Sequence, residues 1–138
     1  MIIIKFLIVS EDQSISSILS KIIQDHNLGE TIEYSCSQFI SESYLLNIKA
    51  IDILIVSLPI AIVNKLISKF DGKIIVVSDI NDKTIIAQAY LLGVEYYITK
   101  PINELEIVEV IKKVVKLIKL QKYMYNIKNI LNMTGTKT

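Results

Sequence analysis

Most side chains that could do chemistry stand directly after short apolar runs. They are Ser10, Glu11, Asp12, Ser57, Ser78 and Lys100. The two carboxylates could hold a cation weakly, and the lysine ammonium group could bind an anion. An unassisted serine hydroxyl is a poor nucleophile at neutral pH, and no base stands near any of these serines. The sequence therefore predicts a protein that is not an enzyme.

Five apolar runs alternate with five segments of helical periodicity, which indicates the elements that carry these residues. The predicted strands cover residues 2–9, 31–35, 51–57, 73–78 and 95–99. The predicted helices cover residues 14–27, 38–47, 60–70 and 82–92, and a long last helix runs from residue 103 to about residue 133. Nearly continuous apolar strands are typical of a parallel sheet that is covered on both faces. The sequence therefore predicts an α/β fold, a doubly wound (βα)5 domain with three layers.

Glycines follow three of the predicted helices. Gly29, Gly72 and Gly93 stand where a helix commonly ends on a residue in the left-handed conformation. Glycine adopts that conformation without strain, so we expect all three to be helix stops.

The polar residues named above share a predicted location. In an open parallel sheet, ligands bind beyond the carboxyl ends of the strands. Ser10, Ser57, Ser78 and Lys100 each follow one of the predicted strands. We therefore expect these side chains to meet at one edge of the sheet.

With Ser78 and Lys100 at strand ends, and with Lys100-Pro101 closing the run AYLLGVEYYITKP, residues 3–120 resemble the receiver domain of two-component response regulators. The strongest match is AYLLGVEYYITKP at residues 89–101, which is close to the receiver pattern A-x-x-x-G-A-x-x-Y-[IL]-x-K-P. The spacing from Ser78 to Lys100 also matches that family. The resemblance implies a flavodoxin-like fold with strand order 2-1-3-4-5 and a role in bacterial phosphorelay signalling.

The resemblance also implies roles for single residues. Lys100 matches the lysine that contacts the phosphoryl group, and the peptide bond before Pro101 matches the family's cis bond. Ser78 matches the switch hydroxyl, and Tyr97 matches the aromatic residue that changes burial with it. Ser57 stands where the family has the aspartate that accepts phosphate. We expect Ser57 not to be phosphorylated, because a serine hydroxyl is a far poorer nucleophile than that aspartate.

The metal site implied by the resemblance has lost most of its carboxylates. Ser10 and Glu11 match the two carboxylates that hold Mg²⁺, with Asp12 as a possible reserve, and Ser57 removes a third carboxylate. Magnesium prefers near-octahedral oxygen ligands that include one or two carboxylates and the substrate phosphate. We therefore expect weak or absent Mg²⁺ binding and no other cofactor. A short turn at Leu58 and Pro59 also replaces a longer loop of the family.

Simpler roles are open for the same residues. Each serine could be a strand-end hydroxyl that caps the next helix. Lys100 could be a surface lysine, or it could form an ion pair with Glu11 or Asp12 in place of metal and phosphate.

Charge is unevenly distributed, although the net charge is only +1. Residues 1–106 carry 8 lysines against 13 acidic residues, and residues 107–138 carry 7 lysines against 1. Every basic residue is lysine, which lacks the forked guanidinium that favours base recognition. Nucleic-acid binding by this chain alone is therefore disfavoured.

Two observations indicate the cellular compartment of the protein. No apolar run approaches the roughly 18 to 20 residues of a membrane-spanning helix. The lone Cys36 cannot form an internal disulfide, which fits a reducing cytosol. We therefore expect a cytoplasmic protein without a membrane segment.

The last helix is predicted to extend beyond the domain. We expect a receiver-like domain over residues 1–120 and a helical extension or linker with a disordered end over residues 121–138. Heptad-like steps of four and three join Val110, Val114, Leu117, Gln121, Met124, Lys128 and Leu131, but polar residues interrupt this seam at Gln121 and Lys128.

The partner predicted from these features is a protein or a second copy. The predicted contact uses the fourth helix, the fifth strand, the last helix and its extension. The proposed surface residues are Tyr90, Tyr96, Ile107, Ile111, Val114 and Ile118. The last four could instead pack the helix on the sheet.

The function that the sequence favours is a receiver-like domain that signals by protein contact without phosphorylation. One alternative is an atypical receiver that binds a small ligand or takes phosphate elsewhere. Another is the severed receiver of a DNA-binding response regulator. An enzyme of flavodoxin-like fold is disfavoured because no glycine-rich phosphate loop follows the first strand.

Overall fold

Five strands alternate with five helices in the computed structural model, which describes residues 2–42, 50–67 and 70–133. The strands are β1 (Lys5–Ser10), β2 (Glu30–Tyr34), β3 (Ile53–Ser57), β4 (Lys73–Ser78) and β5 (Tyr96–Thr99). The helices are α1 (Gln13–Asp25), α2 (Cys36–Glu42), α3 (Ile60–Ile67), α4 (Lys83–Leu91) and α5 (Glu104–Met133). The predicted helical residues 43–47 and 68–69, and the predicted disordered end at 134–138, lie outside the described residues.

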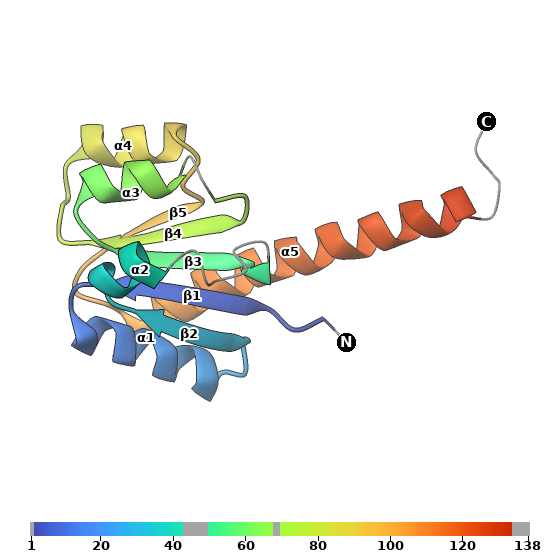
Figure 1. Cartoon of the computed structure of the whole chain (residues 1–138), viewed down its shortest axis with the longest axis horizontal. Coiled ribbons are helices and arrows are strands. Elements are labelled where there is room, and N and C mark those ends of the chain that lie inside the picture. Colours follow the sequence, from blue (N-terminus) through green and yellow to red (C-terminus); the bar gives the residue numbers. More distant parts are fainter. Residues whose placement is uncertain (1, 43–49, 68–69, 134–138) are drawn as a thin grey trace.

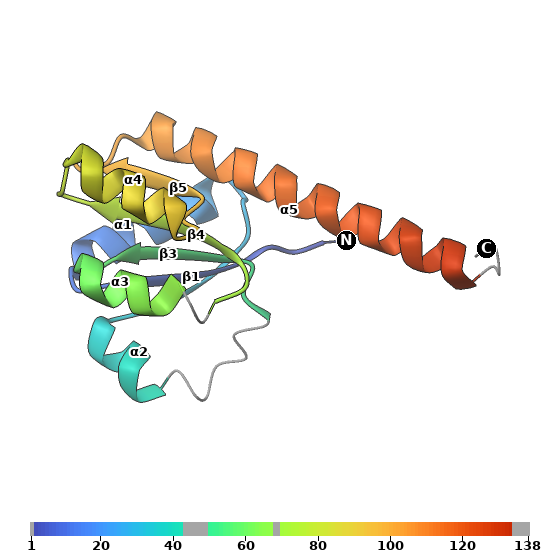
Figure 2. The ribbon, with the colours of Figure 1, turned by 90° about the horizontal axis from the view of Figure 1, so that it is seen from above.

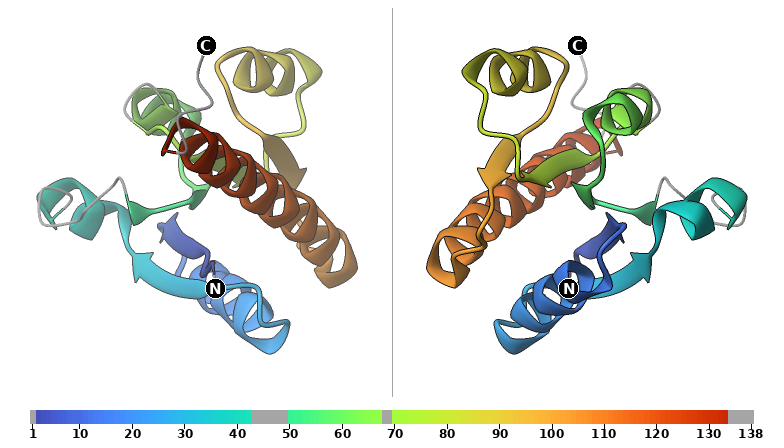
Figure 3. Two further views of the ribbon diagram at one scale, coloured as in Figure 1. Left: turned by 90° about the vertical axis from the view of Figure 1, so that its right-hand side faces the viewer. Right: turned by 90° about the vertical axis from the view of Figure 1, so that its left-hand side faces the viewer.

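All neighbouring strands of the sheet are parallel, in the order β2-β1-β3-β4-β5. Helices α1 and α5 cover one face, and α2, α3 and α4 cover the other (Figures 1 and 3). This arrangement confirms the predicted three-layer, flavodoxin-like (βα)5 fold. It brings the carboxyl ends of β1, β3, β4 and β5 to a single edge.

Burial on both faces explains the continuous apolar strands. Ile53 and Ile55 of β3 belong to the core on the α1 and α5 side, whereas Leu54 and Val56 belong to the core on the α3 side. Successive side chains of a strand point to opposite faces. Every position of a central strand must therefore be apolar when helices cover both faces.

Glycine is required at two helix ends for different reasons. Gly93 has φ 113° and ends α4 in the left-handed conformation, as predicted. At the end of α1 that conformation belongs to Asn27, with φ 50°. The prediction of a left-handed stop was wrong for Gly29, where an added Cβ would overlap the carbonyl oxygen of Ile4. Gly72 is not left-handed either.

Helix α5 packs on the sheet with its first half and projects past the sheet with its second (Figure 2). Ile107, Ile111, Val114 and Ile118 are buried in the core, with exposed fractions between 0% and 6%. Their predicted role as interaction residues was therefore wrong, because a partner cannot reach them. Tyr90 remains 44% exposed, and Tyr96 is partly buried against the same core.

Over the part of the chain that the structure describes, none of the helices combines the length and the apolar character needed to cross a bilayer.

Candidate functional site

A cavity of about 380 Å³ lies at the carboxyl edge of the sheet. Its lining residues are Glu11, Asp12, Ser57, Leu58, Pro59, Val77, Ser78, Asp79, Ile80 and Lys100. Five of the residues predicted from the sequence therefore meet here. Ser10 lies opposite Ser57 in the register of β1 and β3, but it is buried and lines a smaller neighbouring cavity.

The hydroxyl of Ser10 is occupied by the loop that follows it. Its Oγ donates to the carbonyl oxygen of Asp12 at 3.0 Å and accepts from the amide nitrogen of Asp12 at 3.1 Å. The side chain is only 3% exposed. Ser10 therefore fixes the turn between β1 and α1, and it carries no charge for a cation.

The carboxylate of Asp12 caps helix α1. It accepts hydrogen bonds from the amide nitrogen of Ser14 at 2.9 Å and from the Ser14 hydroxyl at 2.6 Å. These bonds hold the pKa of Asp12 below its ordinary value of 3.8, and the charge of Lys100 adds a smaller effect in the same direction. Because the folded-state pKa is depressed, the carboxylate stabilises the fold above about pH 3.8 and this contribution disappears as the pH falls further.

Lys100 has a partner that the sequence did not suggest. Its Nζ lies 3.8 Å from Oδ2 of Asp79, and its side chain is 21% exposed. Asp79 is 81% exposed, so this ion pair contributes little to stability. The position of Asp79, directly after Ser78 at a strand end, was the signal that could have identified it. The peptide bond from Lys100 to Pro101 is cis.

Ser78 and Tyr97 hold the same residue from two sides. The Ser78 Oγ accepts from the amide nitrogen of Ile80 at 3.1 Å, and the Tyr97 hydroxyl donates to the carbonyl oxygen of Ile80 at 3.0 Å. The amide nitrogen of Tyr97 also donates to the hydroxyl of Tyr90 at 2.9 Å. The loop after β4 is thereby connected to both α4 and β5.

The cavity does not fit Mg²⁺. Three carboxylates line it, on Glu11, Asp12 and Asp79, but Asp12 is already the cap of α1 and Asp79 is paired with Lys100. Among residues 2–42, 50–67 and 70–133, no three His, Cys, Asp or Glu side chains are grouped as metal ligands would be. Glu11 is then the remaining carboxylate of the predicted set, whereas the ion favours a fuller oxygen shell.

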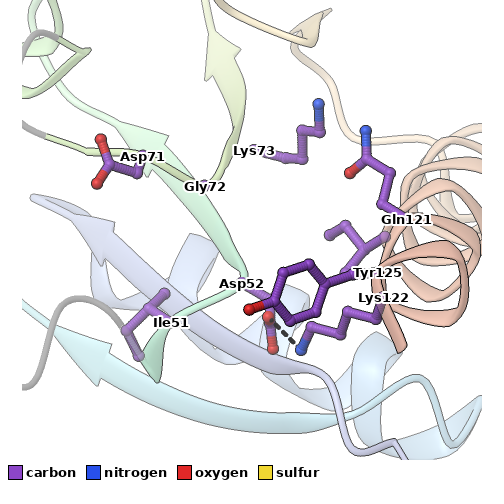
Figure 4. Close-up of a pocket in the computed structure, with 9 residues that line it drawn as sticks. Ile51, Asp52, Asp71, Gly72, Lys73, Gln121, Lys122 and Tyr125 are labelled. Atoms are coloured by element: carbon purple, nitrogen blue, oxygen red, sulfur yellow. Dashed lines mark ion pairs between the residues drawn. The ribbon is translucent and has the colours of Figure 1, made fainter. Parts of the chain in front are cut away.

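A larger cavity, of about 580 Å³, lies at the opposite edge of the sheet, beneath the point where α5 leaves the body (Figure 4). There Oδ1 of Asp52 lies 2.8 Å from Nζ of Lys122, and Oδ2 accepts from the amide nitrogen of Lys5 at 2.9 Å. The Asp52 side chain is 14% exposed. Asp52 therefore joins β1 to α5 at the amino end of β3.

Replacing Asp52 should measurably destabilise the fold. We expect Asp52→Ala to lower the free energy of unfolding by about 1 to 2 kcal/mol, because the Lys5 amide loses its acceptor and Lys122 loses its ion pair. Urea denaturation followed by circular dichroism measures this change. Asp71→Ala is the matched control, because Asp71 is an exposed aspartate of the same cavity. Equal effects of the two substitutions would contradict the linking role.

Comparison with known proteins identifies a relative by sequence similarity. The transcriptional regulatory protein GlnL of Bacillus subtilis (strain 168) is 36% identical in an alignment of 110 residues that covers 75% of this chain. Those residues are 35% of that protein, so the chain spans about a third of the length of the curated relative it matches. No family model matches the chain.

Solved structures show the same fold. A response regulator receiver domain protein from Clostridium thermocellum has a TM-score of 0.72 at 17% identity, covering 86% of this chain and 99% of that one. A receiver domain protein from Methanospirillum hungatei has a TM-score of 0.69 at 18% identity, covering 87% and 99%. A response regulator from Thermotoga maritima has a TM-score of 0.67 at 20% identity, covering 83% and 99%. The chain therefore has the fold of response-regulator receiver domains, and most of its length is similar in sequence to part of a transcriptional regulator.

Proposed function

We propose that this chain is a receiver domain that has lost the phosphoacceptor and signals through protein contact without being phosphorylated. The observation that carries the proposal is the chemistry of the carboxyl-edge cavity. Ser57 stands at the acceptor position, and the carboxylate of Asp12 is used to cap α1. A serine hydroxyl cannot form an acyl phosphate, and with Asp12 used as the cap the remaining groups fall short of a complete magnesium shell.

The groups that would read a phosphate are already bonded within the chain. By the family resemblance, phosphorylation would draw Lys100 and the Ser78 hydroxyl toward the new anion. Here Lys100 is paired with Asp79, and Ser78 accepts from Ile80. This supports a surface whose conformation is set by packing and partners rather than by a phosphoryl group.

The proposed contact surface is the face formed by α4, β5 and α5. On α4 and directly after it, Tyr90 is 44% exposed, Leu91 87% and Leu92 51%. Exposed apolar side chains that cluster together mark protein contact sites. The hydrogen bond from Tyr97 to Tyr90 connects this face to the loop that lines the cavity. We infer a signalling role in the cytoplasm and not an enzymatic one.

The second candidate is the receiver part of a transcriptional regulator. It is favoured by the match to the Bacillus subtilis regulator, of which the chain covers 35%. In that case residues 1–120 are the receiver unit, and residues 121–138 are the connection to an output unit.

Chemical phosphorylation tests the proposal directly. We expect incubation with acetyl phosphate and Mg²⁺ to give no hydroxylamine-labile adduct of about 80 Da, the mass of one phosphoryl group, in the intact mass spectrum. A phosphorylatable receiver domain treated in the same way is the positive control. A labile adduct mapped to Glu11, Asp12 or Asp79 would overturn the loss of phosphorylation and favour the regulated alternative.

A further inference from the structure

The projecting half of α5 carries an unbroken apolar row. Leu117, Leu120, Met124, Ile127 and Leu131 follow one another at steps of three, four, three and four. This spacing is that of the a and d positions of a coiled coil. The seam predicted from the sequence used Gln121 and Lys128 instead and was interrupted there. Leu120 and Met124 are 55% and 59% exposed.

The body of the domain holds the opposite side of the same helix. Ile118, Gln121, Lys122 and Tyr125 line the cavity beneath α5 (Figure 4). Nζ of Lys122 lies 2.8 Å from Oδ1 of Asp52, so this side of the helix faces the body. With about 100° per residue, Leu120 and Met124 lie some 160° around the helix from Lys122. Leu120 and Met124 therefore face away from the body on the helix that projects from the domain (Figure 2), and Leu131 is exposed as well, whereas Leu117 and Ile127 are half-buried.

We propose that this row pairs in parallel with the same row of a second copy of the chain. Such a seam is self-complementary, because the residues at a and d pack against their own counterparts. In a parallel, in-register pair, the positions that flank the row meet across the two helices. Lys116 of one copy lies beside Gln121 of the other, and Tyr123 of one copy lies beside Lys128 of the other. No lysine then faces a lysine, and the second contact places an ammonium group near an aromatic ring.

An acidic helix of another protein fits this surface less well. After Glu109 the described part of α5 carries lysine but no acidic residue. Only Lys116 and Lys128 flank the apolar row, whereas Lys119 and Lys122 lie away from it. An acidic partner would therefore find few of its charges matched along the row, while a second copy matches its apolar positions throughout.

The proposed dimer is weak and reversible. The row spans a little over two heptads, fewer than the roughly three or four that identify a sustained coiled coil. Its helix is nevertheless continuous with the half that packs on the sheet, so association does not require helix nucleation. The pairing is independent of whether the carboxyl-edge cavity takes phosphate.

Sedimentation of the full chain over a range of concentrations tests the pairing. We expect a concentration-dependent dimer whose dissociation constant rises about tenfold or more in Met124→Glu, because two carboxylates would meet inside the seam. Asn126→Glu is the matched control: it adds the same charge at an exposed position off the row, and we expect less than about a twofold change. A chain that stays monomeric, or a dimer that responds equally to both substitutions, would overturn the proposal.

Disulfide cross-linking tests the orientation. In a Cys36→Ser background, Leu120→Cys should form an intermolecular disulfide under mild oxidation, because parallel pairing places residue 120 beside its counterpart. Lys119→Cys should not, because it points away from the seam. Circular dichroism of each variant checks that the fold is kept. A dimer without cross-linking at residue 120 would overturn the parallel arrangement.

Discussion

Ser10→Asp and Ser57→Asp together are expected to convert a chain that takes no phosphoryl group from acetyl phosphate into one that does. The two residues lie opposite each other at the ends of β1 and β3. Aspartate at position 57 supplies a carboxylate nucleophile, and aspartate at position 10 supplies a second carboxylate for Mg²⁺ beside Glu11. Lys100 and Ser78 line the carboxyl-edge cavity together with Ser57, and Ser10 lies buried beside it. Intact mass spectrometry with and without Mg²⁺ measures the hydroxylamine-labile adduct.

The single variant Ser57→Asp separates the nucleophile from the metal site. We expect it to react about tenfold more slowly than the double variant or worse, because its metal shell still lacks one carboxylate. Adding Lys100→Ala to the double variant should reduce the adduct further, since the ammonium group that faces the phosphoryl group is lost. Thermal unfolding establishes that each variant is folded. If Ser57→Asp alone matched the double variant, the loss would lie at residue 57 and not in the metal site as well.

Ile55→Ala is expected to cause the largest loss of stability of any single substitution considered for this chain. Ile55 lies in the central strand β3 and is 0% exposed in the core beneath α1 and α5. Truncating a fully buried isoleucine loses its transfer free energy and leaves a cavity, which together cost about 2 to 5 kcal/mol. Urea denaturation gives the difference in the free energy of unfolding.

Ile3→Ala is the matched control for this prediction. The substitution is chemically identical, but Ile3 is 50% exposed and precedes β1. We expect a change within about 0.5 kcal/mol, as is usual for surface substitutions. Comparable losses for Ile55 and Ile3 would contradict the assignment of β3 to the centre of a sheet that is covered on both faces.

Most residues of the carboxyl-edge cavity could be predicted, because their positions follow from the local sequence at the strand ends. Ser57 and Ser78 each end an apolar run, and parallel strands bring their carboxyl ends to one edge. Asp79 was missed because it belongs to the cavity only through its approach to Lys100, which lies on a different strand end. Asp52 was missed for a similar reason. Its hydrogen bond to Lys5 and its ion pair with Lys122 join residues that are distant in the sequence.

Helix α5 shows what the periodicity of apolar residues cannot predict. The pattern correctly indicated a long helix, but it left open whether its first apolar residues pack on the sheet or face a partner. Ile107 and Ile111 were candidates for a partner surface, yet both are fully buried. A helix that packs on the sheet with one half and projects with the other carries two apolar faces. The position of the sheet decides which of these faces is buried. The contact of Lys122 with Asp52 decides which side of the projecting helix faces the body.

By itself, the sequence determined the alternation of strands and helices, the parallel sheet and the absence of an aspartate at residue 57. These properties follow from the spacing of apolar residues and from residue identity, and both can be read from short stretches of the sequence. Only the tertiary structure decided that Asp12 caps α1, that Lys100 pairs with Asp79, and which side of α5 faces the body beyond the sheet. A carboxylate or an ammonium group can choose among several partners of similar strength, and packing of distant segments decides which of them comes within reach.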